Sequence, residues 1–165
     1  MRRTEEEIPR NNVGGGVNQM AVVKGYEIPE GLYYTKDHAW LKVEGGNKVR
    51  VGLNDFAQKL AGKISYVKVP RVGKEVTHGK VLFSLQAKKW TGKIMVPLAG
   101  MIVEANRDLL RRPGLLNQDC YGKGWVAVIK AANLAQDLAR HLTGEAAHRW
   151  IRKEVARVEA ERGKK

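Results

Sequence analysis

Hydrophobic and polar residues alternate along most of the chain from Tyr33 onwards, which is the pattern of half-buried β-strands. The stretches AWLKVE (39–44) and KVRVGL (48–53) both alternate with a period of two, and the turn residues Gly45-Gly46-Asn47 separate them. They therefore predict a hairpin. Further strands are predicted in KISYVKVP (63–70), in RVGKEVTHGKVLFSLQ (71–86) on either side of a His78-Gly79 turn, and in TGKIMVPL (91–98), GMIVEAN (100–106) and GWVAVIKA (124–131).

Helical signals are short and lie mainly near the end of the chain. Asn54 is a suitable N-cap for FAQKLA (56–61), which Gly62 ends. Asn133 can cap ANLAQDLARHL (132–142), and residues 145–165 form a second helix with a charged, fraying end. Many short strands followed by two helices predict a mostly β fold, a β-sandwich or flattened barrel with short helices and two C-terminal helices.

The same pattern divides the chain into three parts. Residues 1–24 contain EEE, RNN and GGG and have no periodicity, so they are predicted to be a disordered N-terminal extension. Residues 25–130 are predicted to form one domain, and residues 131–165 are expected to pack on that same domain as its C-terminal helices.

Charge is distributed unevenly. The formal net charge is +13, and residues 31–130 carry eighteen Lys and Arg against seven Asp and Glu. Such a field suits nucleic acid, small anions or an acidic partner protein, and it is also compatible with a role in solubility alone. No apolar run reaches the length of a membrane span, and no secretory signal precedes the predicted domain. The single cysteine, Cys120, fits a reducing compartment, so we expect a cytoplasmic protein.

The two longest predicted strands flank the sequence QAKKWTG, residues 86–92. If they pair, Lys88, Lys89 and Trp90 lie at or beside the tip of a hairpin. A lysine amine on a rigid exposed turn is what a swinging prosthetic group requires, because an enzyme can modify it there and the long side chain can then visit other sites. Candidate chemistry therefore concentrates at this turn.

Five groups of residues between Tyr33 and Ile129 form a recognisable series. They are His38 with Trp40, VGLNDFAQKLAGKI (51–64), Pro70 with GKEV (73–76) and Gly79-Lys80, VPLAGMIVEAN (96–106) and GLLNQDCYGKGW (114–125). With these motifs the chain resembles the H protein of the glycine cleavage system, a lipoyl carrier with the hammerhead fold. That resemblance implies a non-enzymatic carrier with lipoate attached covalently to Lys89, and it places Trp90, Gly92, Gln86 and His38 near the cofactor.

Departures from the family pattern concern the cargo. The family's glutamate and serine before the lysine are Gln86 and Ala87 here. Two carboxylates that help hold the cationic aminomethyl cargo in the family are replaced by Ala39 and Lys93. A lysine at that position would repel an ammonium group.

The turn Lys89-Trp90-Thr91-Gly92 resembles instead the lipoate-binding proteins that act with a heterodisulfide-reductase-like complex in sulfur oxidation. We therefore expect a carrier of sulfur intermediates, with the H protein of glycine cleavage as the alternative. The implied partners are a lipoate ligase or lipoyl transferase, lipoamide dehydrogenase, and either that complex or the glycine cleavage P, T and L proteins. No membrane or metal is expected.

Several interpretations stay open at the level of the sequence. A carrier that has lost its arm, a biotinyl carrier, and a basic scaffold or nucleic-acid-binding protein without cofactor are rivals. The biotinyl carrier is disfavoured because it would place methionines beside the lysine, and the nucleic-acid binder because no binding motif is recognisable. Trp90 either shelters the cargo or packs across the hairpin. His38 either contacts the cargo or makes a structural hydrogen bond, and the structural role is favoured for both.

Overall fold

The computed structural model describes residues 21–88 and 90–163. Antiparallel pairing builds three sheets, of which the largest has seven strands in the order β12-β3-β4-β5-β11-β10-β7. A three-stranded sheet has the order β6-β8-β9, and β1 pairs with β2 alone. The strands are β1 (Val22–Val23), β2 (Tyr26–Glu27), β3 (Tyr33–Tyr34), β4 (Ala39–Glu44), β5 (Lys48–Leu53), β6 (Ile64–Lys68), β7 (Glu75–Val76), β8 (Val81–Ala87), β9 (Thr91–Met95), β10 (Gly100–Ala105), β11 (Ala127–Ala131) and β12 (Leu142–Thr143).

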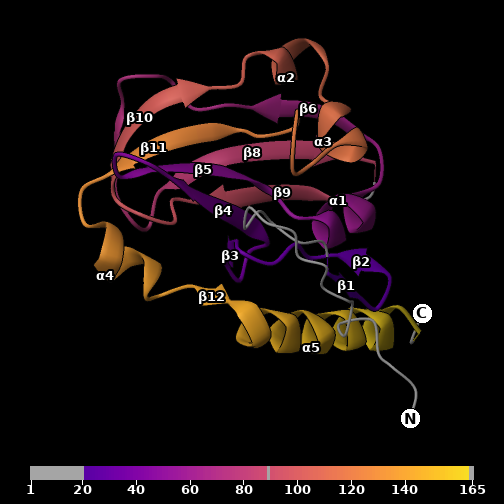
Figure 1. Cartoon of the computed structure of the whole chain (residues 1–165). Coiled ribbons are helices and arrows are strands. Elements are labelled where there is room, and N and C mark those ends of the chain that lie inside the picture. The colour runs from indigo at the N-terminus through magenta and orange to yellow at the C-terminus, as the bar shows by residue number, and fades with distance from the viewer. Residues whose placement is uncertain (1–20, 89, 164–165) are drawn as a thin grey trace.

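Short helices connect or cover the strands. They are α1 (Asp55–Ala61), α2 (Asp108–Arg111), α3 (Leu115–Gln118), α4 (Leu134–Leu138) and the longer α5 (Gly144–Gly163). Figure 1 shows α5 lying along the lower side of the sheets, next to β1, while α2 lies at the opposite, upper edge. The predicted mostly β fold with short helices is confirmed.

Local sequence explains the best-predicted elements. The β4–β5 hairpin matches its predicted bounds, and Gly46 and Asn47 take the positive φ angles (71° and 63°) that such a tight turn needs. At α1, the Asn54 side chain accepts a hydrogen bond from the Ala57 amide (2.8 Å), and the helix ends at Gly62. The N-cap prediction is therefore confirmed.

The larger core lies between the seven-stranded and the three-stranded sheet. Its buried side chains come from alternate positions of β4 and β5 on one side and of β8 and β9 on the other. Leu41, Val51, Leu85 and Ile94 are representative, each at most 1% exposed. This core fixes the pleat of β8 and β9, so the remaining positions of these strands point away from it.

A second core, which we call the helix-covered core, lies under α5. Ala147, Ile151 and Val155 from α5 are fully buried there against Tyr34 and Trp40 and against residues of the N-terminal segment. Because α5 brings its buried residues at helical spacing onto this cluster, it belongs to the same compact unit.

Three expectations differ from the structure. The predicted extension ends too late, since Ala21 and Val23 are buried and Val22–Val23 is paired; residues 1–20 lie outside the described part. The first C-terminal helix is only Leu134–Leu138, and Asn133 makes no side-chain cap bond. Leu142 and Thr143 form a strand on the edge of β3 instead, because this pairing satisfies backbone groups that a longer helix would have used internally.

No helix among the described residues is long and apolar enough to cross a membrane.

Candidate functional site

The β8–β9 hairpin carries the candidate modification site. Its strands pair from Val81 opposite Met95 to Gln86 opposite Thr91, and the Ala87 amide then donates to the Trp90 carbonyl (2.9 Å). Only Lys88 and Lys89 separate this closing pair in the sequence. The predicted attachment residue, Lys89, lies outside the described residues, while Lys88 is exposed and its amide donates to the Lys63 carbonyl (3.0 Å). Of the residues that flank Lys89, Lys88 is thus bonded to the residue before β6, and Trp90 is bonded to Ala87.

Trp90 packs against Gly92 and the larger core. A Cβ added to Gly92 would lie 2.4 Å from Cη2 and 2.5 Å from Cζ2 of the Trp90 ring. Gly92 is buried and Trp90 is half-buried against the larger core. The tryptophan ring therefore requires a glycine two residues later, which gives a physical reason for finding the two residues together.

The remaining predicted residues of the hairpin point in different directions. Gln86 is exposed on the outer face of the sheet, opposite Tyr66 of β6, whereas Ala87 is half-buried. Lys93 is exposed and faces the same way as Ser84, its partner across the hairpin. Ala39, at the start of β4, is fully buried in the larger core, so this position presents no side chain to solvent.

His38 lies under α5. Its Nε2 is 3.3 Å from a carboxylate oxygen of Glu154, and its ring lies 5.0 Å from Trp150 and 5.2 Å from Phe56 between centroids. Burial lowers the pKa of His38, and the Glu154 carboxylate opposes this effect. The backbone of His38 has a positive φ of 76°, which few side chains tolerate. The contacts with Glu154 and Trp150 attach α5 to the domain, the contact with Phe56 joins His38 to α1, and none is to a residue of the β8–β9 hairpin.

Sequence reasoning missed a carboxylate at the free edge of β9. The Asp37 carboxylate accepts the Met95 amide (2.8 Å) and also the Thr35 hydroxyl. Because β9 is an edge strand of its sheet, this bond satisfies a backbone donor that no neighbouring strand pairs. No sequence motif includes Asp37. Its only link to the family motifs is that it precedes His38.

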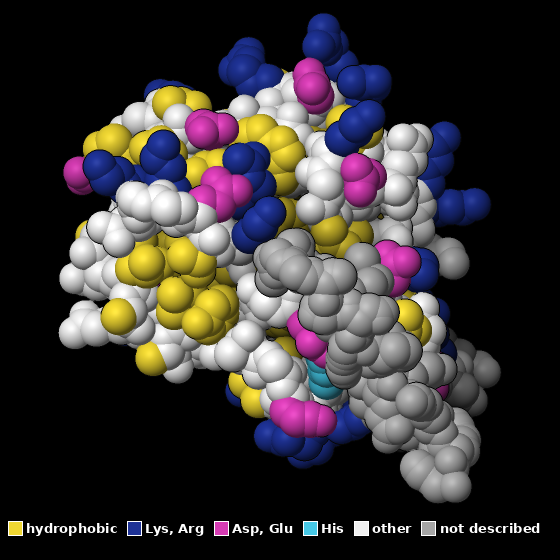
Figure 2. Space-filling model, in the orientation of Figure 1, with side chains coloured by type: hydrophobic (Ala, Val, Ile, Leu, Met, Phe, Trp, Pro, Cys, Tyr) yellow, Lys and Arg dark blue, Asp and Glu magenta, His cyan; other side chains and the backbone are white. Residues whose placement is uncertain are grey.

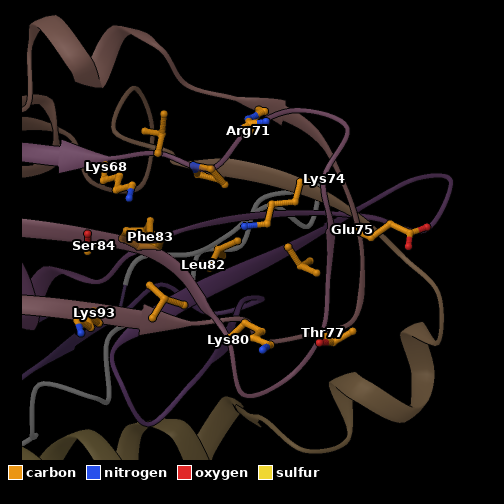
Figure 3. Close-up of a pocket in the computed structure, with 14 residues that line it drawn as sticks. Lys68, Arg71, Lys74, Glu75, Thr77, Lys80, Leu82, Phe83, Ser84 and Lys93 are labelled. Carbon is orange, nitrogen blue, oxygen red and sulfur yellow. The ribbon is translucent and has the colours of Figure 1, made fainter.

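Sequence reasoning also missed a basic groove beside the hairpin. It is a cavity of about 830 Å³, which we call the basic groove. Figure 3 shows side chains that line it. Five of its side chains are cations and one is a carboxylate. The lining comes from the end of β6, the segment that follows it, β7, the turn after β7, and parts of β8 and β9. The charged members are Lys68, Arg71, Lys74, Lys80, Lys93 and Glu75. The high charge of residues 31–130 was a signal of it, but a linear count cannot tell which lysines share a face.

The cysteine and the metal-binding types of side chain are the next candidates for chemistry within the part of the chain that the structure describes. Cys120 is buried, and burial raises the pKa of its thiol, which keeps it protonated and unreactive. Within residues 21–88 and 90–163, no group of three or more His, Cys, Asp or Glu side chains could hold a metal ion.

Comparison with known proteins assigns the chain to a family. The family model described as "Glycine cleavage H-protein" matches residues 32–154, well over half of the chain. The "Probable glycine cleavage system H protein" of Thermococcus gammatolerans is 41% identical over 132 residues, which cover 80% of this chain and 98% of that protein. The "Glycine cleavage system H protein 2" of Aquifex aeolicus is 38% identical over 141 residues, covering 85% of this chain and 88% of the relative.

A solved structure shows the same fold. The crystal structure of a glycine cleavage system H protein from Mycobacterium marinum superposes with a TM-score of 0.61 at 28% sequence identity. The match covers 68% of this chain and 97% of that one.

Proposed function

Because the chain belongs to the glycine cleavage H-protein family of lipoyl carriers, which are not themselves enzymes, we propose that Lys89 is the residue that carries its lipoyl group. The observation that supports this assignment is the closed end of the β8–β9 hairpin. Ala87 and Trp90 pair directly, while the neighbouring side chains of Gln86, Lys88 and Thr91 are exposed. A modifying enzyme therefore has access to a turn whose flanks are held in place.

The protein and its prosthetic group have separate tasks. When attached, the dithiolane of a lipoyl group supplies redox and group-transfer chemistry. The chain itself provides a stiff support, to which the Trp90–Gly92 contact and the bond from Lys88 to Lys63 contribute. The proposed partners are a lipoate ligase or lipoyl transferase and lipoamide dehydrogenase, in the cytoplasm.

Glycine cleavage is the first candidate pathway. The relatives reported above are named as H proteins of that system and match the chain over most of their length. In this role the arm would carry an aminomethyl group from the P protein to the T protein, and the L protein would reoxidise the arm afterwards. At the position of Ala39 the family has a carboxylate that this chain lacks. Among the described residues, the acidic residue nearest to that position in the sequence is Asp37.

Sulfur oxidation is the second candidate, and it is favoured by a different observation. Lys93 is exposed where the family pattern has a carboxylate, and it opens into the basic groove. A sulfur group on dihydrolipoyl thiols is neutral or anionic, so a cationic neighbourhood suits it better than it suits an ammonium group. The proposed partner in that case is a heterodisulfide-reductase-like complex.

Loading with lipoate in the presence of a lipoate ligase, read by intact mass, tests the attachment site. We expect one lipoyl adduct on the wild type, none on Lys89→Arg, and an unchanged adduct on the matched control Lys88→Arg. An adduct that survives Lys89→Arg contradicts the assignment. The lipoylated protein is then assayed for glycine turnover with the P protein. Turnover by the wild type supports the first candidate. If the wild type shows no turnover and the Lys93→Asp variant does, the second candidate is supported.

A further inference from the structure

The basic groove concentrates cations that have no acidic partner among residues 21–88 and 90–163. Within the described residues, none of Lys68, Arg71, Lys74, Lys80 and Lys93 has a carboxylate at ion-pair distance, although other exposed Lys and Arg side chains do, such as Lys59 with Asp55. Figure 3 shows the Glu75 carboxylate pointing away from the other labelled side chains, while Lys74 extends into the space between them. The field of the groove is therefore not neutralised from within.

Apolar side chains form part of the same surface. Tyr66 is 48% exposed, Val81 42% and Met95 38%, and Val81 pairs with Met95 across β8 and β9. Val81 also lines the groove. Exposed apolar residues beside a charged cavity are typical of a surface that another protein covers, because burying them adds affinity that charge alone does not supply.

This surface continues to the proposed attachment site. Lys68, Ser84 and Lys93 form one row across β6, β8 and β9, and Tyr66, Gln86 and Thr91 form the next row towards the tip. Lys93 lies three positions after Trp90, which at the rise of a β-strand is about 10 Å. A molecule seated in the groove is thus within reach of a group carried at the end of the hairpin.

We propose that the basic groove, with its apolar rim of Tyr66, Val81 and Met95, is the docking surface for an acidic protein that works on the arm. This inference rests on the proposed carrier function. The groove would receive a loop of the partner that bears several carboxylates, and the apolar rim would pack against the partner's surface around that loop. Complementary charge then speeds encounter and fixes orientation with the partner's active site towards the tip.

Nucleic acid fits this surface less well. A nucleic-acid site needs a basic track long enough to follow phosphates, together with aromatic side chains or groups that read bases. Here the groove cations, which lack an acidic partner among the described residues, lie around one short cavity, and Tyr66 is the single aromatic side chain of the three that form the rim. Lys and Arg side chains also gather at the upper edge over α2 (Figure 2), but there Arg111 is paired with Asp108.

Binding of a fluorescent oligoglutamate peptide to the full-length protein tests the surface. The double variant Lys74→Glu/Lys80→Glu reverses two groove cations whose side chains are exposed. The matched control Lys42→Glu/Lys130→Glu reverses two exposed lysines on the other sheet, in β4 and β11, and has the same net charge. If only the long-range attraction between the protein and the peptide mattered, the two variants would lose the same amount of affinity.

We expect the groove variant to bind the peptide at least about tenfold more weakly than the wild type, and the control to change by less than about twofold. Carbodiimide coupling of the peptide to the wild type should mark Lys68, Lys74, Lys80 or Lys93. Equal losses in the two variants, coupling elsewhere, or tighter binding of duplex DNA than of the peptide would overturn the proposal.

Lipoylation is measured in parallel by intact mass. An unloaded wild type shows that the carrier assignment has failed, whatever the peptide does. A loaded wild type that binds the peptide no better than the groove variant shows that the docking proposal alone has failed. The two ideas therefore stand or fall on separate readouts.

Discussion

The β8–β9 hairpin and the helix-covered core differ in whether their polar side chains have partners. At the helix-covered core, buried polar groups have partners: Glu154 contacts both His38 and Arg157, and the Trp40 indole donates to the Cys120 carbonyl (2.9 Å). Around the hairpin, the cations of the basic groove have no acidic partner among the described residues. Satisfied polar groups keep a core rigid, whereas unsatisfied exposed charges remain available to another molecule.

This difference separates the part of the protein that maintains the fold from the part that meets partners. Figure 1 shows α5, which covers the helix-covered core, at the lower side of the molecule and away from α2. Substitutions there should change stability with little effect on modification. Substitutions at the hairpin should do the reverse, except where the hairpin itself is tightly packed.

The largest effect is expected from a cavity in the helix-covered core. Ile151 is fully buried on α5, so Ile151→Ala should lower the free energy of unfolding by about 2–5 kcal/mol. Urea unfolding measures the loss, and Leu110→Ala, at a side chain that is 44% exposed, is the control with a change near zero. The folded fraction should still accept lipoate at the wild-type rate. A stability loss no larger than that of the control would break the comparison.

An intermediate effect is expected where the hairpin is packed. Gly92→Ala places a Cβ against the Trp90 ring, and overpacking of this kind costs about 1–3 kcal/mol. Trp90→Ala removes the ring that the new Cβ would meet. In the Trp90→Ala background, Gly92→Ala should therefore leave the free energy of unfolding unchanged or raise it by stabilising β9. Unfolding free energies of the four proteins give the coupling. Additive changes would show that the ring and the glycine do not restrict each other.

The sequence predicted the regular parts of the fold because local chemistry determines them. Alternation placed β4 and β5, and Asn54 and Gly62 marked the ends of α1. It did not predict β12, since Leu142 and Thr143 are a strand only because the edge of β3 is there to pair with them. The paired N-terminal segment was missed for the same reason: two valines and a turn carry little signal until β2 lies beside them.

The part of the candidate site that consists of neighbours in the sequence could be predicted, but the part that strand pairing brings together could not. The neighbours of Lys89 could be read from the order of residues, and the attachment itself stays a prediction. The basic groove combines side chains from positions 68 to 93 that meet only when β6, β8 and β9 are in register. Asp37 meets Met95 across 58 positions of sequence, and no periodicity reports such a contact.

The smallest expected effect concerns the pH dependence of the helix-covered core. The pKa of His38 is lowered in the folded protein, chiefly by burial, from the ordinary value of 6.5. As the pH falls, the unfolded chain therefore binds a proton at this residue before the folded protein does. The contribution of His38 to the free energy of unfolding should be constant above pH 6.5 and should decrease between pH 6.5 and the lowered pKa. Urea unfolding at a series of pH values measures this decline.

Two variants should move that decline in opposite directions. His38→Asn, whose side chain tolerates a positive φ, should flatten it, although the overall stability also falls as the ring contacts are lost. Glu154→Gln removes the carboxylate that raises the pKa of His38, so the decline should extend to lower pH. Because the basic groove lies outside this network, oligoglutamate binding measured where both variants remain folded should be the same as for the wild type. A parallel loss of binding in His38→Asn would show that the two regions are coupled and that the division between them is incorrect.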